Sequence, residues 1–196
     1  MLFRSLAAET IRLPASFRCF DQHPRDIMAL ADRFAATYPD RSAPLLVVGV
    51  RTSGAYLAPI AAAHLRARGY NRVELITVRP LAQLDAGVVA RMNAVATGGG
   101  YALLLDDPPV SGSSLATVTA LLDRHGFSAR RVVPLLAVAN AEGDPPPALW
   151  ASPTLTLATG DWHLRLALGA EQVAADLTRL RPDVRSEEHT SELQSR

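Results

Sequence analysis

The chain has 196 residues, of which 48% are hydrophobic and 20% are charged, and its formal net charge is +1. This length fits one domain at roughly 100–200 residues per domain, and the composition excludes a disordered polyelectrolyte and a fibrous repeat. All 20 basic residues are arginine, which excludes enzymes that form a lysine Schiff base and P-loop NTPases that need the motif lysine.

Charge placement and cysteine content bear on partners and location. The arginines are scattered along the chain, so we expect no nucleic-acid partner. Cys19 is the single cysteine and cannot form an internal disulfide, which is typical of a reducing compartment. No stretch reaches the roughly 20 apolar residues of a membrane span, and charged residues interrupt the N-terminal segment. We therefore expect a cytoplasmic protein without a membrane partner.

Hydrophobic patterning predicts alternating helices and strands. Residues 24–38, 55–68 and 114–125 have helical spacing, and short apolar runs at 45–50, 73–78, 101–105 and 132–139 are typical of buried strands. A further strand at 154–157 and a helix at 170–180 follow. This alternation predicts an α/β fold, a three-layer domain around a parallel sheet.

Residues 80–100 have weak periodicity and end in three glycines. We interpret this segment as a long flexible connection, with room for a helical turn, that acts as a lid. Closure of such a lid would exclude water from a site at the edge of the sheet.

The turn after the first predicted strand contains Gly49, Arg51, Thr52, Ser53 and Gly54. Ligands of open parallel sheets bind beyond the carboxyl ends of the strands, and this turn opens a helix whose amides could hold an anion. We expect its hydroxyls to be exposed. The alternative is that the glycines only make a tight corner.

The turn after the predicted strand 101–105 is more specific. Asp106 and Asp107 leave the strand, and a Ser/Gly segment that becomes a helix N-terminus follows. Its amides and hydroxyls can surround a phosphate, and ionised carboxylates can accept bonds from sugar hydroxyls. A ribose 5-phosphate carries both a phosphate group and a pair of neighbouring hydroxyl groups, so it fits such a site. The alternatives are a structural loop cap and a hydrolase that uses the paired aspartates.

This segment resembles the phosphoribosyl pyrophosphate signature of the type I phosphoribosyltransferases. The turn at 49–54 and the loop at 80–100 fall where that family has its pyrophosphate turn and its hood loop, so the similarity covers roughly residues 40–140. It departs from the family at Pro108 and Pro109, usually aliphatic, and at Val110, where purine-salvage members carry an acid. A simple hypoxanthine or guanine salvage enzyme is therefore disfavoured.

The resemblance implies a role for each matching residue. Asp106 and Asp107 would bind the ribose hydroxyls and Mg²⁺, and Arg51 would offset charge on the leaving pyrophosphate. The remaining residues would hold phosphate groups: Thr52, Ser53, Gly54 and Arg79 the pyrophosphate, and Ser111, Gly112, Ser113 and Ser114 the 5-phosphate. We therefore expect a pentosyltransferase acting on phosphoribosyl pyrophosphate and an unidentified acceptor. The alternative is a non-catalytic regulatory module that binds phosphoribosyl pyrophosphate or a nucleotide.

We expect a single domain over residues 1–184, with a core at about 40–140 and hood elements from 1–39 and 141–184. A homodimer is left open. The tail at 185–196, RSEEHTSELQSR, resembles a translated sequencing adapter. We interpret it as artefactual or disordered, in which case the natural chain would continue past Val184.

Overall fold

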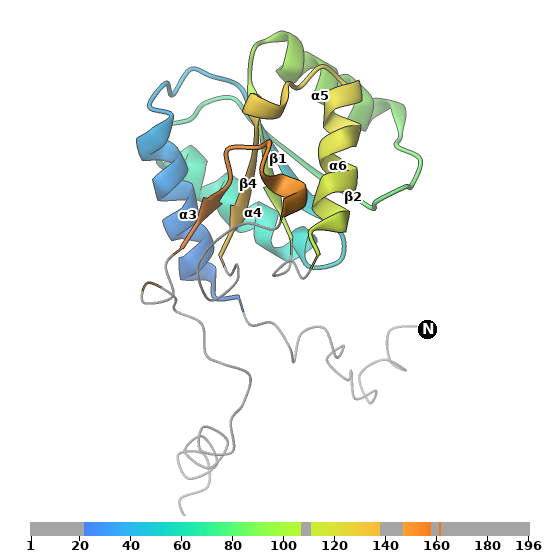
Figure 1. Cartoon of the computed structure of the whole chain (residues 1–196). Coiled ribbons are helices and arrows are strands. Elements are labelled where there is room, and N and C mark those ends of the chain that lie inside the picture. Colours follow the sequence, from blue (N-terminus) through green and yellow to red (C-terminus); the bar gives the residue numbers. More distant parts are fainter. Residues whose placement is uncertain (1–21, 107–110, 138–146, 158–160, 162–196) are drawn as a thin grey trace, which may run out of the picture. The chain divides into compact units, whose positions relative to one another are not determined.

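The computed structural model describes residues 22–106, 111–137, 147–157 and 161 (Figure 1). These residues fall within one compact unit, Gln22–Leu164. The predicted helix at 170–180, the tail at 185–196 and Asp107 lie outside the described residues.

Helices and strands alternate along this unit, as the sequence predicts. The elements are α3 (Pro24–Thr37), β1 (Leu45–Val50), α4 (Gly54–Ala67), β2 (Val73–Val78), α5 (Ala86–Thr97), β3 (Tyr101–Leu105), α6 (Ser113–Arg124), η1 (Ala129–Arg131), β4 (Val132–Leu136), η2 (Pro147–Leu149) and β5 (Leu155–Thr156). The strands form a five-stranded sheet in the order β2-β1-β3-β4-β5, and every neighbouring pair is parallel.

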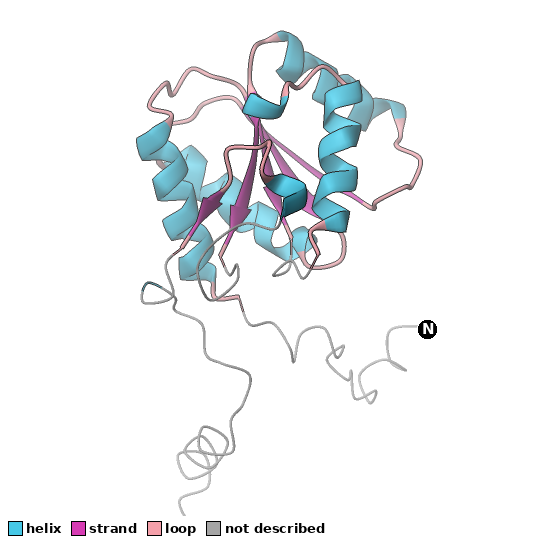
Figure 2. Ribbon diagram, in the orientation of Figure 1, coloured by secondary structure: helices cyan, strands magenta, loops and turns pink. Residues whose placement is uncertain are grey.

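The sheet lies between two helical layers, with α3 and α4 on one face and α5 and α6 on the other (Figures 1 and 2). All six residues of β1 are buried, because both faces of this strand are covered. Its continuous apolar sequence is typical of such a strand. The three-layer α/β fold expected from the sequence is therefore confirmed.

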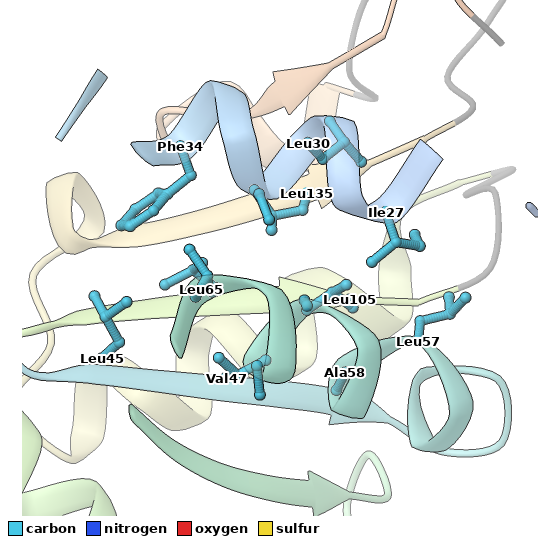
Figure 3. Packing of buried hydrophobic residues seen from close by; sticks show 14 of the residues in the cluster. Ile27, Leu30, Phe34, Leu45, Val47, Leu57, Ala58, Leu65, Leu105 and Leu135 are labelled. Carbon is cyan, nitrogen blue, oxygen red and sulfur yellow. The ribbon is translucent and has the colours of Figure 1, made fainter. Parts of the chain in front are cut away.

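α3 is held on the sheet by one apolar stripe. Ile27, Leu30 and Phe34 recur at helical spacing and are almost fully buried. In Figure 3 these side chains point toward Leu135 of β4 and toward α4. The N-terminal end of α3 lies on the side of the sheet where the strands end (Figure 1), and Gln22, just ahead of this helix, donates a hydrogen bond to the backbone of Asp106 after β3.

The expectation of a long loop over 80–100 is wrong for residues 86–97, which form α5. The side chain of Asp85 caps this helix by accepting a hydrogen bond from the amide of Val88 at 2.8 Å. Val88, Met92 and Val95 are buried on one stripe against the sheet. The loop before the helix is therefore short, at 79–85, and Leu81 within it is 94% exposed with a φ of 64°.

Two arginines contact the free edge of β2. Nη2 of Arg66, from α4, donates to the carbonyl oxygen of Val73 at 2.6 Å. Nη1 of Arg91, from α5, donates to the carbonyl oxygen of Leu75 at 3.4 Å. Each helical layer thus supplies one guanidinium group to backbone acceptors on the side of β2 where none of the described strands pairs with it. Charged groups on an edge strand disfavour pairing with another chain.

Candidate functional site

The order of the strands defines a switch point between β1 and β3. After β1 the chain continues to β2 on one side, and after β3 it continues to β4 on the other. Ligands of open α/β sheets bind outside the carboxyl ends of the strands at this point. Gly49 of β1 pairs with Leu105 of β3 at the end of the ladder. The turn at 49–54 and the segment that starts at Asp106 therefore leave the sheet side by side.

The backbones of these two segments are in direct contact. A Cβ atom on Gly54 would lie 2.4 Å from the carbonyl oxygen of Leu105, and a Cβ atom on Gly49 would lie 2.1 Å from the carbonyl oxygen of Gly54. Both distances are shorter than any real Cβ contact, so both positions require glycine. The glycines predicted from the sequence to frame the first turn thus bring it against the end of β3.

The side chains between these glycines differ in exposure. Arg51 and Thr52 are exposed and joined by a cis peptide bond, whereas Ser53 is buried, with 4% of its surface exposed. The expectation that both hydroxyls of this turn are exposed is therefore wrong for Ser53. This residue lies in the turn where α4 begins, and its backbone carbonyl accepts a hydrogen bond from the amide of Tyr56 at 2.9 Å.

Arg51 and Arg79 place two cations at neighbouring strand ends. β1 and β2 pair as far as Val50 and Val78, so each arginine is the first residue after its strand. Nε of Arg51 donates to Oγ1 of Thr77 at 3.0 Å. Within the described part of the chain, the other guanidinium nitrogens of Arg51 and the whole guanidinium of Arg79 have no partner. These groups are available to an anion.

The N-terminus of α6 supplies a second set of donors. Gly112 is its N-cap, with a φ of 74°, and as a glycine it offers no side chain to cap the helix. The hydroxyl of Ser111 accepts a bond from the amide of Ser113 at 3.3 Å and donates to the hydroxyl of Ser113 at 3.1 Å. Ser111, Ser113 and Ser114 are exposed. Amides of a first helical turn lack partners within the helix, so this end of α6 favours an anion.

Asp106 is half-buried and follows β3 directly, whereas Asp107 lies outside the described residues. The backbone carbonyl of Asp106 accepts a hydrogen bond from Nε2 of Gln22 at 3.0 Å. No local pattern in the sequence links Gln22, which lies ahead of the first described helix, to the end of β3.

The described residues contain no group of three His, Cys, Asp or Glu side chains that could hold a metal ion. Mg²⁺ is usually bound through one or two carboxylates together with phosphate oxygens of the substrate and water. Asp106 and Asp107 match that donor set, and they would hold Mg²⁺ only together with a phosphate-bearing ligand. None of the described helices is long and apolar enough to cross a bilayer.

The fold and the site thus define an α/β protein with two exposed arginines and a helix N-terminus near the switch point of its sheet. No protein-family model matches the chain, and no curated protein matches it. The chain is similar to a solved structure of hypoxanthine phosphoribosyltransferase from Trypanosoma cruzi in complex with the product IMP. The two sequences are 13% identical and the TM-score is 0.44. The aligned region covers 78% of this chain and 91% of that chain. A mutant of that enzyme in a ternary substrates complex is 13% identical with a TM-score of 0.45 and covers 69% of this chain and 77% of that chain.

An extracellular ligand-binding receptor from Verminephrobacter eiseniae is similar to the same degree, at 13% identity and a TM-score of 0.44, and covers 84% of this chain and 48% of that chain. Similarities this distant identify neither a family nor an activity, since an enzyme and a receptor match equally well.

Proposed function

We propose that this protein is a phosphoribosyltransferase-like enzyme. It binds phosphoribosyl pyrophosphate and transfers the ribose 5-phosphate to an acceptor with release of pyrophosphate. The observation that carries the proposal is that three groups follow the carboxyl ends of adjacent strands. They are the N-terminus of α6 at Gly112, the carboxylate of Asp106 at the end of β3, and the cations Arg51 and Arg79 after β1 and β2.

The chemistry of these groups corresponds to the parts of that ligand. Amides and hydroxyls at 111–114 suit the 5-phosphate, because a helix N-terminus favours a dianion. Asp106 and Asp107 accept bonds from the ribose hydroxyls. Arg51 follows β1 and Arg79 follows β2, the strand on the other side of β1 from β3, and both suit the pyrophosphate. Lysine is absent from the chain, so guanidinium groups supply all of this positive charge.

In the transfer, the bond between the anomeric carbon and the pyrophosphate oxygen breaks, and its electron pair leaves with pyrophosphate. A lone pair of the acceptor forms the new bond to the same carbon, and the acceptor loses its proton to water. Arg51 and Arg79 stabilise the charge that develops on the leaving group. Mg²⁺, held by Asp106 and Asp107 with phosphate oxygens, would supply further charge neutralisation when bound.

Calorimetric titration of phosphoribosyl pyrophosphate with Mg²⁺ tests the binding. We expect saturable binding to the wild type and a loss of roughly tenfold to a hundredfold in affinity for Arg51→Gln, since a bond between charged groups contributes about 1.5–3 kcal/mol. Arg130→Gln is the matched control, because Arg130 is exposed and precedes β4 at the opposite edge of the sheet. Equal losses in both variants, or no binding to the wild type, would contradict the proposal.

Turnover is tested by measuring pyrophosphate release with a panel of nucleobases and small amines as acceptors. Release that depends on both the acceptor and Mg²⁺ supports the transferase. Tight binding of phosphoribosyl pyrophosphate without release in any acceptor's presence would favour the regulatory module instead.

A further inference from the structure

The side chain of Arg51 is held by the neighbouring strand β2. Its Nε donates to Oγ1 of Thr77 at 3.0 Å, although the two residues lie 26 positions apart in the sequence. The backbone of Arg51 contacts the same strand, because its amide donates to the carbonyl oxygen of Val78 at 2.8 Å. Both the main chain and the side chain of Arg51 are therefore anchored at the carboxyl end of β2.

The fold fixes the position of the Thr77 hydroxyl. Thr77 pairs with Gly49 in the last pair but one of the parallel ladder between β1 and β2. Its neighbours Ile76 and Val78 are buried in the layer formed with α5 and α6. Side chains alternate along a strand, so Thr77 projects from the other face, which α4 covers. Threonine has little freedom about χ1, so its oxygen is a rigid acceptor.

The bond to Thr77 leaves one particular part of the Arg51 guanidinium group for a ligand. Nε is engaged, whereas Nη1 and Nη2 have no partner within the described residues. The N–H groups of these two terminal nitrogens form a planar fork that matches two oxygens of one phosphate group. Arg51 is therefore arranged to contact a phosphate group through its two terminal nitrogens.

Holding this side chain in the free protein has an energetic consequence. An exposed arginine samples many rotamers, and ordering such a long side chain on binding weakens the affinity for a ligand. The bond to Thr77 orders Arg51 before the ligand arrives, which removes part of that cost. Within the described residues, Arg51 is the only hydrogen-bond partner of the Thr77 side chain. The polar contact of this hydroxyl is thus spent on Arg51 alone.

We propose that Thr77 is a positioning residue that preorganises Arg51 for the pyrophosphate group. This inference rests on the proposed function and assigns part of the selectivity for a pyrophosphate-bearing ligand to a strand residue outside the turns that the sequence singles out. Thr77 acts only through Arg51. Its replacement should therefore weaken the binding of ligands that carry pyrophosphate and leave the binding of a ligand that carries only the 5-phosphate.

The test compares Thr77→Val with the wild type in calorimetric titrations of phosphoribosyl pyrophosphate, inorganic pyrophosphate and ribose 5-phosphate, all with Mg²⁺. Valine keeps the branched shape of threonine and removes the acceptor oxygen. We expect about a fivefold loss of affinity for the two pyrophosphate ligands and less than about a twofold change for ribose 5-phosphate, the size of effect that ordering one long side chain supports.

Thr37→Val is the matched control. It also removes a hydroxyl that makes one hydrogen bond, in this case to the carbonyl oxygen of Arg33 at 2.9 Å. Thr37 ends α3, and the next residue, Tyr38, packs on Tyr101 at the start of β3, so Thr37 lies at the end of the sheet away from the site. All three affinities should stay within about twofold of the wild type in this variant.

Two further variants distinguish positioning of Arg51 from a structural role of Thr77. Thr77→Ser keeps the hydroxyl and should recover most of the pyrophosphate affinity that Thr77→Val loses. In the Arg51→Gln background, Thr77→Val should have no further effect on affinity, because glutamine lacks the Nε group through which Thr77 acts. This double-mutant cycle measures the coupling between the two side chains directly.

Several outcomes would overturn the inference. These are equal losses for all three ligands in Thr77→Val, unchanged affinities in that variant, no recovery in Thr77→Ser, or the same loss from Thr77→Val when Arg51 is already replaced. Failure of the wild type to bind phosphoribosyl pyrophosphate would instead overturn the proposed function, and the role of Thr77 with it.

Discussion

The carbonyl oxygen of Leu105 occupies the space in which a side chain on Gly54 would begin, since a Cβ atom there would lie 2.4 Å from it. The last residue of β3 and the first residue of α4 therefore meet backbone to backbone. This contact joins the turn at 49–54 to the segment that follows Leu105. The distance between these two segments is therefore fixed by the packing of the backbone.

Gly54→Ala should disrupt this junction. Neither the carbonyl of Leu105 nor the backbone of Gly49, 2.7 Å from the added atom, can move without shifting a central strand. We expect a loss of about 1–3 kcal/mol or more in the free energy of unfolding, measured by urea denaturation. Gly87→Ala in α5 is the control, because the nearest atom there is a side-chain oxygen of Asp85 at 3.2 Å. A Gly54 variant as stable as this control would contradict the close contact.

Gly112→Val should abolish binding of 5-phosphorylated ribose, because it puts a branched side chain on a residue with a φ of 74° at the start of α6. Gly69→Val is the matched control. Gly69 has a φ of 93° and no atom within 4 Å of an added Cβ, so it carries the same kind of backbone strain far from the site. Calorimetry should show binding lost in the first variant and kept in the second.

The surface between α3 and α4 should respond to pH through Asp32. Burial raises the pKa of Asp32, but hydrogen bonds from His64 and Arg68 outweigh burial and hold the pKa below its usual 3.8. A lowered folded-state pKa stabilises the protein above the unfolded value, and this contribution is lost as the pH falls through the folded value.

The melting temperatures of the wild type and Asp32→Asn should therefore differ more at about pH 5 than at about pH 2.5. Asp123→Asn is the control, because the described residues give the Asp123 carboxylate no hydrogen bond. A difference for Asp32→Asn that stays constant over this range would show that its ion pairs do not stabilise the fold.

Removing the guanidinium groups from the free edge of β2 should promote self-association. The double variant Arg66→Ser with Arg91→Ser exposes the carbonyl groups of Val73 and Leu75 to pairing with another chain. Sedimentation velocity should show larger species in this variant at concentrations where the wild type shows none.

The control is the double variant Arg124→Ser with Arg130→Ser, which removes the same amount of positive charge. It distinguishes the effect of exposing the edge of β2 from the effect of losing two positive charges. Both of these arginines are exposed and lie away from β2. Self-association of this control to the same extent would refute the role of the edge contacts.

The sequence predicted the central strands because each is a short segment rich in branched apolar residues, and a polar or glycine-containing turn follows it. The expected strands at 45–50, 73–78 and 101–105 coincide with β1, β2 and β3. A parallel sheet predicts that the turns after these strands lie at the same end of the sheet, and the resemblance implies that the turn at 49–54 and the acids after Leu105 bind one ligand. The strand order adds that β1 and β3 are neighbours.

The remaining features depend on contacts that no local pattern contains. α5 was missed because alanine and glycine dilute its apolar stripe, and only the packing of Val88, Met92 and Val95 on the sheet reveals it. The burial of Ser53 and the bond from Gln22 to Asp106 arise only once distant segments have met.

The placement of α3 has a consequence for synthesis of the chain. α3 is the first described helix, yet it packs on β4 through Leu135 (Figure 3). Arg33 of this helix also forms an ion pair with Asp161 at 3.0 Å. α4 can cover part of the apolar stripe of α3 early, but the part that faces β4 stays uncovered on the ribosome until Leu135, about 100 residues later, has emerged. This delay exposes the nascent chain to chaperones and postpones completion of this layer.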